Sequence, residues 1–192
     1  MNSIETLILN FGYIAIFCFM ITNGIVSLPS SNFIYIIAGF LVATGRLLFV
    51  PTVVMGTAGN VIGNIILYEI ARRKGQGYIT RWRMFPEAKM VKLHRAFERK
   101  GTVIIFVGKF LPGVKVFVPA VAGIANMGRG IYVFIISVTS FLWAAGLTYF
   151  GVMFGKNFEG GKFGIWSCVL VGFAIIAIYV FHRYVESVSL EQ

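Results

Sequence analysis

The chain has 192 residues, of which 58% are hydrophobic and only 12% are charged, and its formal net charge is +10. Soluble domains contain about 25% charged residues, and here apolar runs recur from residue 4 to residue 182, more than one soluble core could bury. The composition excludes a soluble enzyme and predicts an all-α integral membrane protein, because a spanning helix needs about 20 apolar residues.

Four apolar segments have the length expected of membrane-spanning helices. The first of them does not resemble a cleavable signal peptide, because residues 1–6 contain Glu5 and no lysine or arginine. We therefore expect this segment to remain in the mature protein as a span. The predicted spans cover about residues 4–24, 51–71, 128–155 and 162–183.

Two further apolar segments are interrupted by polar residues, proline and glycine. Residues 28–46 begin with Pro-Ser-Ser-Asn and are too short to span comfortably, and residues 102–126 are broken by prolines and glycines. Each of these segments precedes an uninterrupted span, so the chain contains a rough internal repeat. Such pairs are typical of transporters with inverted repeats, and we predict two opposed re-entrant helical hairpins within a single membrane domain, residues 1–192.

The basic residues are concentrated in one polar segment, residues 72–101. Ten of the 17 lysines and arginines lie between Arg72 and Lys100. This distribution indicates a cytoplasmic segment by the positive-inside rule, attractive to anionic lipids, and it does not favour nucleic-acid binding. With this orientation both termini are predicted to be cytoplasmic. Helical spacing of apolar residues predicts a surface helix over residues 86–100.

Lys109 and Lys115 are the most informative residues, because they lie inside an apolar segment on either side of the break at Pro112. A charge at membrane depth is costly and marks function by default. The alternative is that a lysine extends its ammonium group to the membrane interface. An ammonium group beside the free backbone N–H groups of a broken helix is well suited to binding phosphate.

Glu69 is the one carboxylate well inside an apolar segment, since the chain contains no aspartate and its other glutamates lie at the ends of apolar segments or in polar stretches. One interpretation is an ion pair with Arg72 or Arg73 at helical spacing. The other is a functional role, as a coupling group or as a partner for a cationic lipid head group.

Asparagines at membrane depth are usually hydrogen-bond partners in helix packing, but Asn32 and Asn126 flank the two broken segments. Together with Asn64, these two residues are candidates for a polar substrate path, and Pro112 is a further substrate-binding candidate beside the two lysines. The cysteines and histidines have no ligand spacing, so no metal and no cofactor are expected. No catalytic constellation is recognisable, and we expect a protein that is not an enzyme.

The segment F-V-G-K-F-L-P-G-V-K at residues 106–115 resembles the motif F-x-G-R-F-x-P-x-x-R of the DedA family, membrane proteins with the VTT domain. The likeness extends over about residues 10–160 and includes a stretch similar to the family's G-D-x-x-x-Y element at residues 63–68. The family's two arginines are Lys109 and Lys115 here, and its aspartate is Asn64. The bidentate fork of arginine is thereby lost while the positive charge is kept.

The resemblance implies a bacterial or archaeal inner-membrane protein that moves lipids between leaflets, such as undecaprenyl phosphate or a phospholipid. It also implies two re-entrant hairpins that face each other. We therefore expect a flippase- or scramblase-like lipid transporter whose partners are membrane lipids with phosphate-bearing head groups; self-association is left open. The alternatives are a proton- or cation-coupled exporter of small solutes, which would depend on Glu69, and a non-transporting scaffold that binds partners through residues 72–100.

Overall fold

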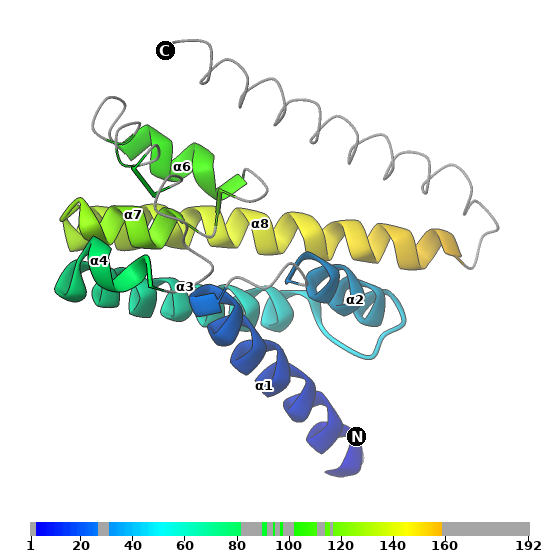
Figure 1. Cartoon of the computed structure of the whole chain (residues 1–192). Helices are drawn as coiled ribbons and strands as arrows, with labels where there is room; N and C mark the ends of the chain where they lie inside the picture. Colours follow the sequence, from blue (N-terminus) through cyan, green and yellow to red (C-terminus); the bar gives the residue numbers. More distant parts are fainter. Residues whose placement is uncertain are drawn as a thin grey trace.

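A computed structural model describes most of the chain, and every regular element among the described residues is a helix (Figure 1). The predicted span at residues 162–183 lies outside these residues. The described residues are 3–26, 31–81, 90–91, 94, 97, 102–110, 114–115 and 117–158. The helices are α1 (Ser3–Val26), α2 (Ser31–Ala43), α3 (Phe49–Lys74), α4 (Gln76–Ile79), α6 (Thr102–Phe110), α7 (Val118–Ile124) and α8 (Arg129–Phe158).

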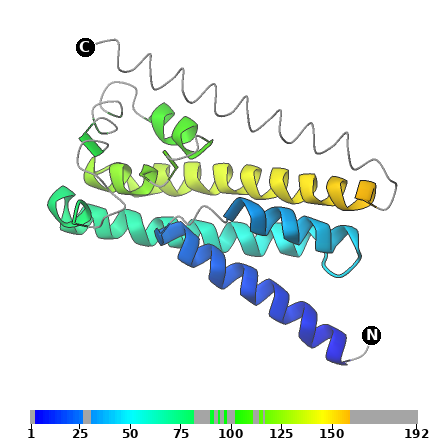
Figure 2. The same ribbon diagram turned by 45° about the vertical axis from the view of Figure 1, so that its right-hand side comes forward.

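The two long helices α3 and α8 form the centre of the molecule and lie side by side in opposite directions (Figures 1 and 2). Both are long and apolar enough to cross a membrane. α3 begins two residues before Pro51, which therefore occupies the first turn, where a missing N–H costs no helical hydrogen bond. It ends at Gly75, whose φ of 73° favours glycine.

The two interrupted segments form short helices. α2 has 13 residues and is therefore about 20 Å long, whereas the hydrocarbon core of a bilayer is about 30 Å thick. α6 and α7 have nine and seven residues, and Val114 and Lys115, which lie between them, form a turn. The interruptions were therefore predicted from the sequence, whereas insertion of these segments as opposed hairpins in an inverted repeat stays a prediction.

Glycines allow the helices to approach until their backbones touch. α1 packs on α3, and a side chain at Gly63 would meet the Ile21 carbonyl oxygen at 2.2 Å. α2 packs on α8, where a side chain at Gly39 would meet the Thr148 carbonyl oxygen at 2.1 Å. Small residues of this kind are typical of helix contacts in membranes, where close backbone packing replaces the hydrophobic effect as the driving force.

Aromatic and aliphatic side chains fill the space between α3, α7 and α8. The rings of Tyr68 and Tyr132 stack with centroids 4.3 Å apart and are fully buried. Met90 is also buried and belongs to a cluster of apolar side chains from α3 and α7, with Phe97 packed against it. These two residues of the predicted surface helix, most of which lies outside the described residues, thus contribute to the core.

The outer surface of the helices carries large apolar side chains. Phe11, Phe33, Val50 and Phe134 are each exposed by two-thirds or more. Exposed apolar surface of this extent is unusual for a soluble monomer and marks a contact surface. On helices of this length and composition it fits contact with lipid.

The glycine contacts generate a prediction that two positions of α8 can test. We expect Gly151→Ala to lower the free energy of unfolding by about 1–3 kcal/mol, because the new methyl group would lie 2.2 Å from the Ile36 carbonyl oxygen. Gly146→Ala is the matched control, since its new methyl group meets nothing within 4 Å. Alanine is the better helix former there, by up to about 1 kcal/mol. Thermal unfolding in detergent, followed by circular dichroism, measures both; equal effects at the two positions would contradict the packing described.

Candidate functional site

The side-chain amine of Lys109 is buried inside the helix bundle. The residue is 7% exposed, near the end of α6. Its Nζ donates hydrogen bonds to Asn60 Oδ1 and Asn64 Oδ1, both at 3.1 Å. Both acceptors are neutral amides, so they solvate the charge without neutralising it.

Asn60 is the centre of this cluster because its Oδ1 accepts from three donors. These are Lys109 Nζ, Ser140 Oγ at 3.0 Å and Asn64 Nδ2 at 3.0 Å. Asn64 Nδ2 also donates to the Asn60 carbonyl oxygen, as the two residues are one helical turn apart on α3. An amide oxygen has two lone pairs, so three donors compete for it. The cluster therefore has more donor capacity than the amides can satisfy.

Lys115 belongs to a second group of donors that converge on one amide. Its Nζ donates to Asn32 Oδ1 at 3.3 Å, and the indole Nε1 of Trp143 donates to the same oxygen at 3.1 Å. Lys115 is half-buried in the connection between α6 and α7, and Asn32 lies at the start of α2. This group thus joins α2, α8 and the connection that carries the lysine.

The two groups adjoin through α8, where Ser140 and Trp143 are three residues apart and so lie on the same face. They lie near the middle of the long helices. Asn60 is about 16 Å from the first residue of α3 and about 21 Å from the last, at 1.5 Å per residue. We call Lys109, Lys115, Asn32, Asn60, Asn64, Ser140 and Trp143 the central cluster.

The structure brings together four of the predicted site residues, namely Lys109, Lys115, Asn32 and Asn64. Asn126 is exposed, in the turn between α7 and α8, where it adopts a φ of 52°. Asparagine tolerates this left-handed conformation better than most residues, which gives Asn126 a structural role. It makes no hydrogen bond to the central cluster within the described part of the chain. Pro112 lies outside the described residues.

Three members of the central cluster were not predicted as site residues. Asn60 was assigned to helix packing, although its spacing of four residues from Asn64 places both on one face of α3. Trp143 gave no signal of its own, as a single tryptophan in a long apolar helix. Ser140 gave no signal, because one serine in a long apolar helix is common and its partner is 80 residues away.

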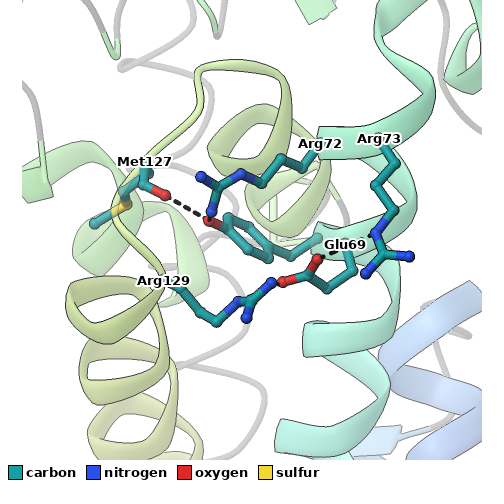
Figure 3. A network of polar contacts seen from close by, with 6 residues as sticks. Glu69, Arg72, Arg73, Met127 and Arg129 are labelled. Carbon is teal, nitrogen blue, oxygen red and sulfur yellow. Dashed lines mark hydrogen bonds and ion pairs between the residues drawn. The ribbon is translucent and has the colours of Figure 1, made fainter.

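A second polar network lies at the end of the bundle where α3 ends and α8 begins (Figure 3). Glu69 accepts from Arg129 Nε at 2.7 Å, and Arg73 Nε lies 3.7 Å from its other carboxylate oxygen. The contact with Arg73 agrees with the interpretation that Glu69 forms an ion pair at helical spacing. Arg129 lies on α8, so local spacing could not identify it as a partner of Glu69. The pair is partly exposed, so it contributes little to stability.

Arg72 contacts Tyr68, whereas its helical spacing had suggested an ion pair with Glu69. It donates to the Tyr68 hydroxyl at 2.9 Å, and that hydroxyl donates to the Met127 carbonyl oxygen (Figure 3). The buried tyrosine thereby ties α3 to the turn before α8. Among the described residues, no group of three or more histidine, cysteine or acidic side chains could hold a metal ion.

We expect the hydrogen bonds of Lys109 to be energetically coupled to Asn60. Asn60→Leu should lower the free energy of unfolding by about 1 kcal/mol or more beyond the amount by which it lowers that free energy in a Lys109→Met background. The reason is that, with Lys109 present, leucine leaves a buried ammonium group with one acceptor fewer. Equilibrium unfolding of the two single variants and the double variant in mixed micelles measures this coupling.

Thr57→Val is the matched control on α3. The Thr57 hydroxyl is buried and has no hydrogen-bond partner among the described residues, so its removal should cost nothing in either background. If the loss of unfolding free energy in the double variant equals the sum of the losses in Asn60→Leu and Lys109→Met, the described contact between Asn60 and Lys109 is contradicted.

Comparison with known proteins confirms the family resemblance. The sequence matches the family model described as the VTT domain over residues 28–153. It is 29% identical to an uncharacterized membrane protein, YbfM, of Bacillus subtilis, over 74% of this chain and 90% of the relative. It is 25% identical to undecaprenyl phosphate transporter A of Staphylococcus aureus, over 93% of this chain and 92% of the relative.

Another relative, from Lactococcus lactis, is named alkaline phosphatase-like protein and is 27% identical over 84% of this chain and 80% of its own length. No solved structure gives a significant match. The VTT match covers more than half of the chain and all of the described residues of the central cluster. The chain therefore belongs to the VTT-domain family of membrane proteins, also called the DedA family.

Proposed function

We propose that this protein moves lipids with phosphate-bearing head groups between the leaflets of a bacterial membrane. Family membership and the names of two relatives, undecaprenyl phosphate transporter A of S. aureus and of B. subtilis, support a role in membrane transport. The substrate class and the leaflet exchange are our inference from the central cluster.

The observation that carries the proposal is a pair of lysines near the middle of the two long helices. The hydrogen bonds of Lys109 go to neutral amides, and the sequence contains no acidic residue between Glu98 and Glu159. The one carboxylate on α3, Glu69, pairs with arginines at the end of the helix. The central cluster therefore contains two lysines and no carboxylate, and an anion would complete it.

A phosphate group matches the donors that the cluster presents. An ammonium group has three N–H donors, and the described contacts of Lys109 use two of them. Lys115 and the Trp143 indole converge on one oxygen, that of Asn32, and a phosphate oxygen could take its place. Charge-assisted hydrogen bonds of this kind are stronger than those to neutral amides, so exchange of the amide for a phosphate is favourable.

The hydrocarbon chains of the lipid would remain in the bilayer while the head group crosses. Large apolar side chains cover the outer surface of α3 and α8, among them Val54, Ile62 and Phe141. A lipid chain can lie against this surface without burying polar groups. Only the head group then needs the protein, and the central cluster supplies polar partners midway along its path.

The other functions considered have weaker structural support. A coupled exporter would need Glu69 as a coupling group, yet this carboxylate is engaged by Arg129 and Arg73 at the end of the bundle. The scaffold hypothesis rests on residues 72–100, most of which lie outside the described residues.

Leaflet exchange of a fluorescent phospholipid or prenyl phosphate in liposomes tests the proposal. We expect Lys109→Ala/Lys115→Ala to lower the rate about ten-fold or more, because each lysine supplies a charge-assisted hydrogen bond of about 1.5–3 kcal/mol. Lys109→Arg/Lys115→Arg should keep most of the activity, since it preserves both charges. Inorganic phosphate release, measured in the same samples, identifies a phosphatase if the activity is hydrolytic.

The control is Arg73→Ala/Lys156→Ala, which removes two exposed cations outside the central cluster. This variant should exchange lipids at the wild-type rate. Undiminished exchange in the lysine double variant, with its helical content intact, would remove the central cluster as the site. Lipid-linked phosphate release without leaflet exchange would replace transport by hydrolysis.

A further inference from the structure

A groove between α1 and α2 is a second place where a lipid could bind. It has a volume of about 370 Å³ and lies where α1 diverges from the rest of the bundle toward its N-terminal end (Figures 1 and 2). Apart from one arginine its lining is apolar. The lining residues are Gly12, Ala15, Ile16, Ile34, Ile37, Ala38, Leu41, Arg46 and Leu47.

The surroundings of the groove determine what can fill it. Phe11 and Ile14 on α1, Ile37 on α2 and Leu48 after α2 are all exposed by more than half. This face is therefore apolar around the groove as well as within it, and the chain belongs to a family of membrane proteins. In a bilayer such a face contacts hydrocarbon, and water in the groove would find almost no hydrogen-bond partners. A lipid chain is the occupant that matches both the groove and its surroundings.

Arg46 is the one charged residue among the described residues that line the groove. Its side chain is exposed and makes no hydrogen bond or ion pair with any residue in the described ranges. The turn that carries it lies between the end of α2 and the start of α3, so it lies at one end of the bundle rather than at its middle. A guanidinium group binds phosphate through a planar fork of donors.

We propose that the groove binds one hydrocarbon chain of an anionic phospholipid whose phosphate is held by Arg46. This site is separate from the central cluster. Lys115 of the central cluster donates to Asn32 at the start of α2, whereas Arg46 lies beyond the opposite end of that helix. The proposal does not depend on leaflet exchange, since a bound lipid at this site can support the fold or recruit lipids without crossing the bilayer.

Binding of two lipids with identical chains tests the site in the purified full-length protein. Dioleoyl phosphatidylglycerol and dioleoyl phosphatidylcholine are titrated in detergent, and bound lipids are counted by native mass spectrometry. We expect Arg46→Gln to weaken phosphatidylglycerol binding about five-fold, the effect of one cation near a membrane surface, and to leave phosphatidylcholine unchanged. Lys156→Gln, an exposed cation at the end of α8, is the matched control and should bind as wild type.

A second pair of variants tests the groove itself. Ala15→Phe places a ring in the groove and should remove one bound lipid of either kind, whereas Cys18→Phe adds the same ring at an exposed position of α1 that does not line the groove. Lys115→Ala should keep the Arg46-dependent binding, which separates this site from the central cluster. Wild-type binding in both Arg46→Gln and Ala15→Phe would overturn the proposal. So would a change of oligomeric state in Ala15→Phe on size-exclusion chromatography, since the groove would then be a contact between copies.

Discussion

The placement of one lysine amine inside an apolar bundle is the constraint on which the rest of the structure depends. A charge removed from water is costly unless other groups solvate it, and Lys109 finds that solvation in Asn60 and Asn64. Both amides lie on one face of α3 and reach the lysine only because α6 lies near the middle of the bundle. The polar side chain of Ser140 then completes the cluster from α8. Removal of any one of these groups leaves the others unsatisfied, so the site and the core stabilise each other.

The contacts between helix backbones determine which turns of the helices face each other. A side chain at Gly59 or Gly63 of α3 would collide with a carbonyl oxygen of α1. Gly39 of α2 and Gly151 of α8 lie against each other in the same way, and a side chain at Gly123 would collide with the Tyr68 carbonyl oxygen. A helix that touches its neighbour at a glycine has little freedom to slide along it, because any side chain there would collide. The same contacts thus position Asn32 opposite Trp143. The glycines act on the site although none of them is part of it.

Much of the fold and half of the site followed from the sequence. Hydropathy and the interruption around Pro112 indicate where long apolar helices form and where they break, because these features are local. The lysines stood out for the same reason, since a charge in an apolar segment is visible without partners. Ser140, Trp143 and Arg129 could not be found in this way. Their importance lies in contacts with residues 60–111 positions away, and nothing in their own neighbourhoods distinguishes them from ordinary residues of a long helix.

The shortness of α2 has a consequence for the barrier to crossing a membrane. A head group that crosses pure hydrocarbon must travel about 30 Å without polar partners. Arg46 and Asn32 lie at opposite ends of a helix about 20 Å long, and Arg72, Arg73 and Arg129 lie at the other end of the bundle. If a lipid head group crosses as proposed, these polar groups would divide its path into shorter steps, each with donors at both ends. Because the desolvation of a head group dominates its barrier, two low barriers in series are crossed far more often than one high barrier.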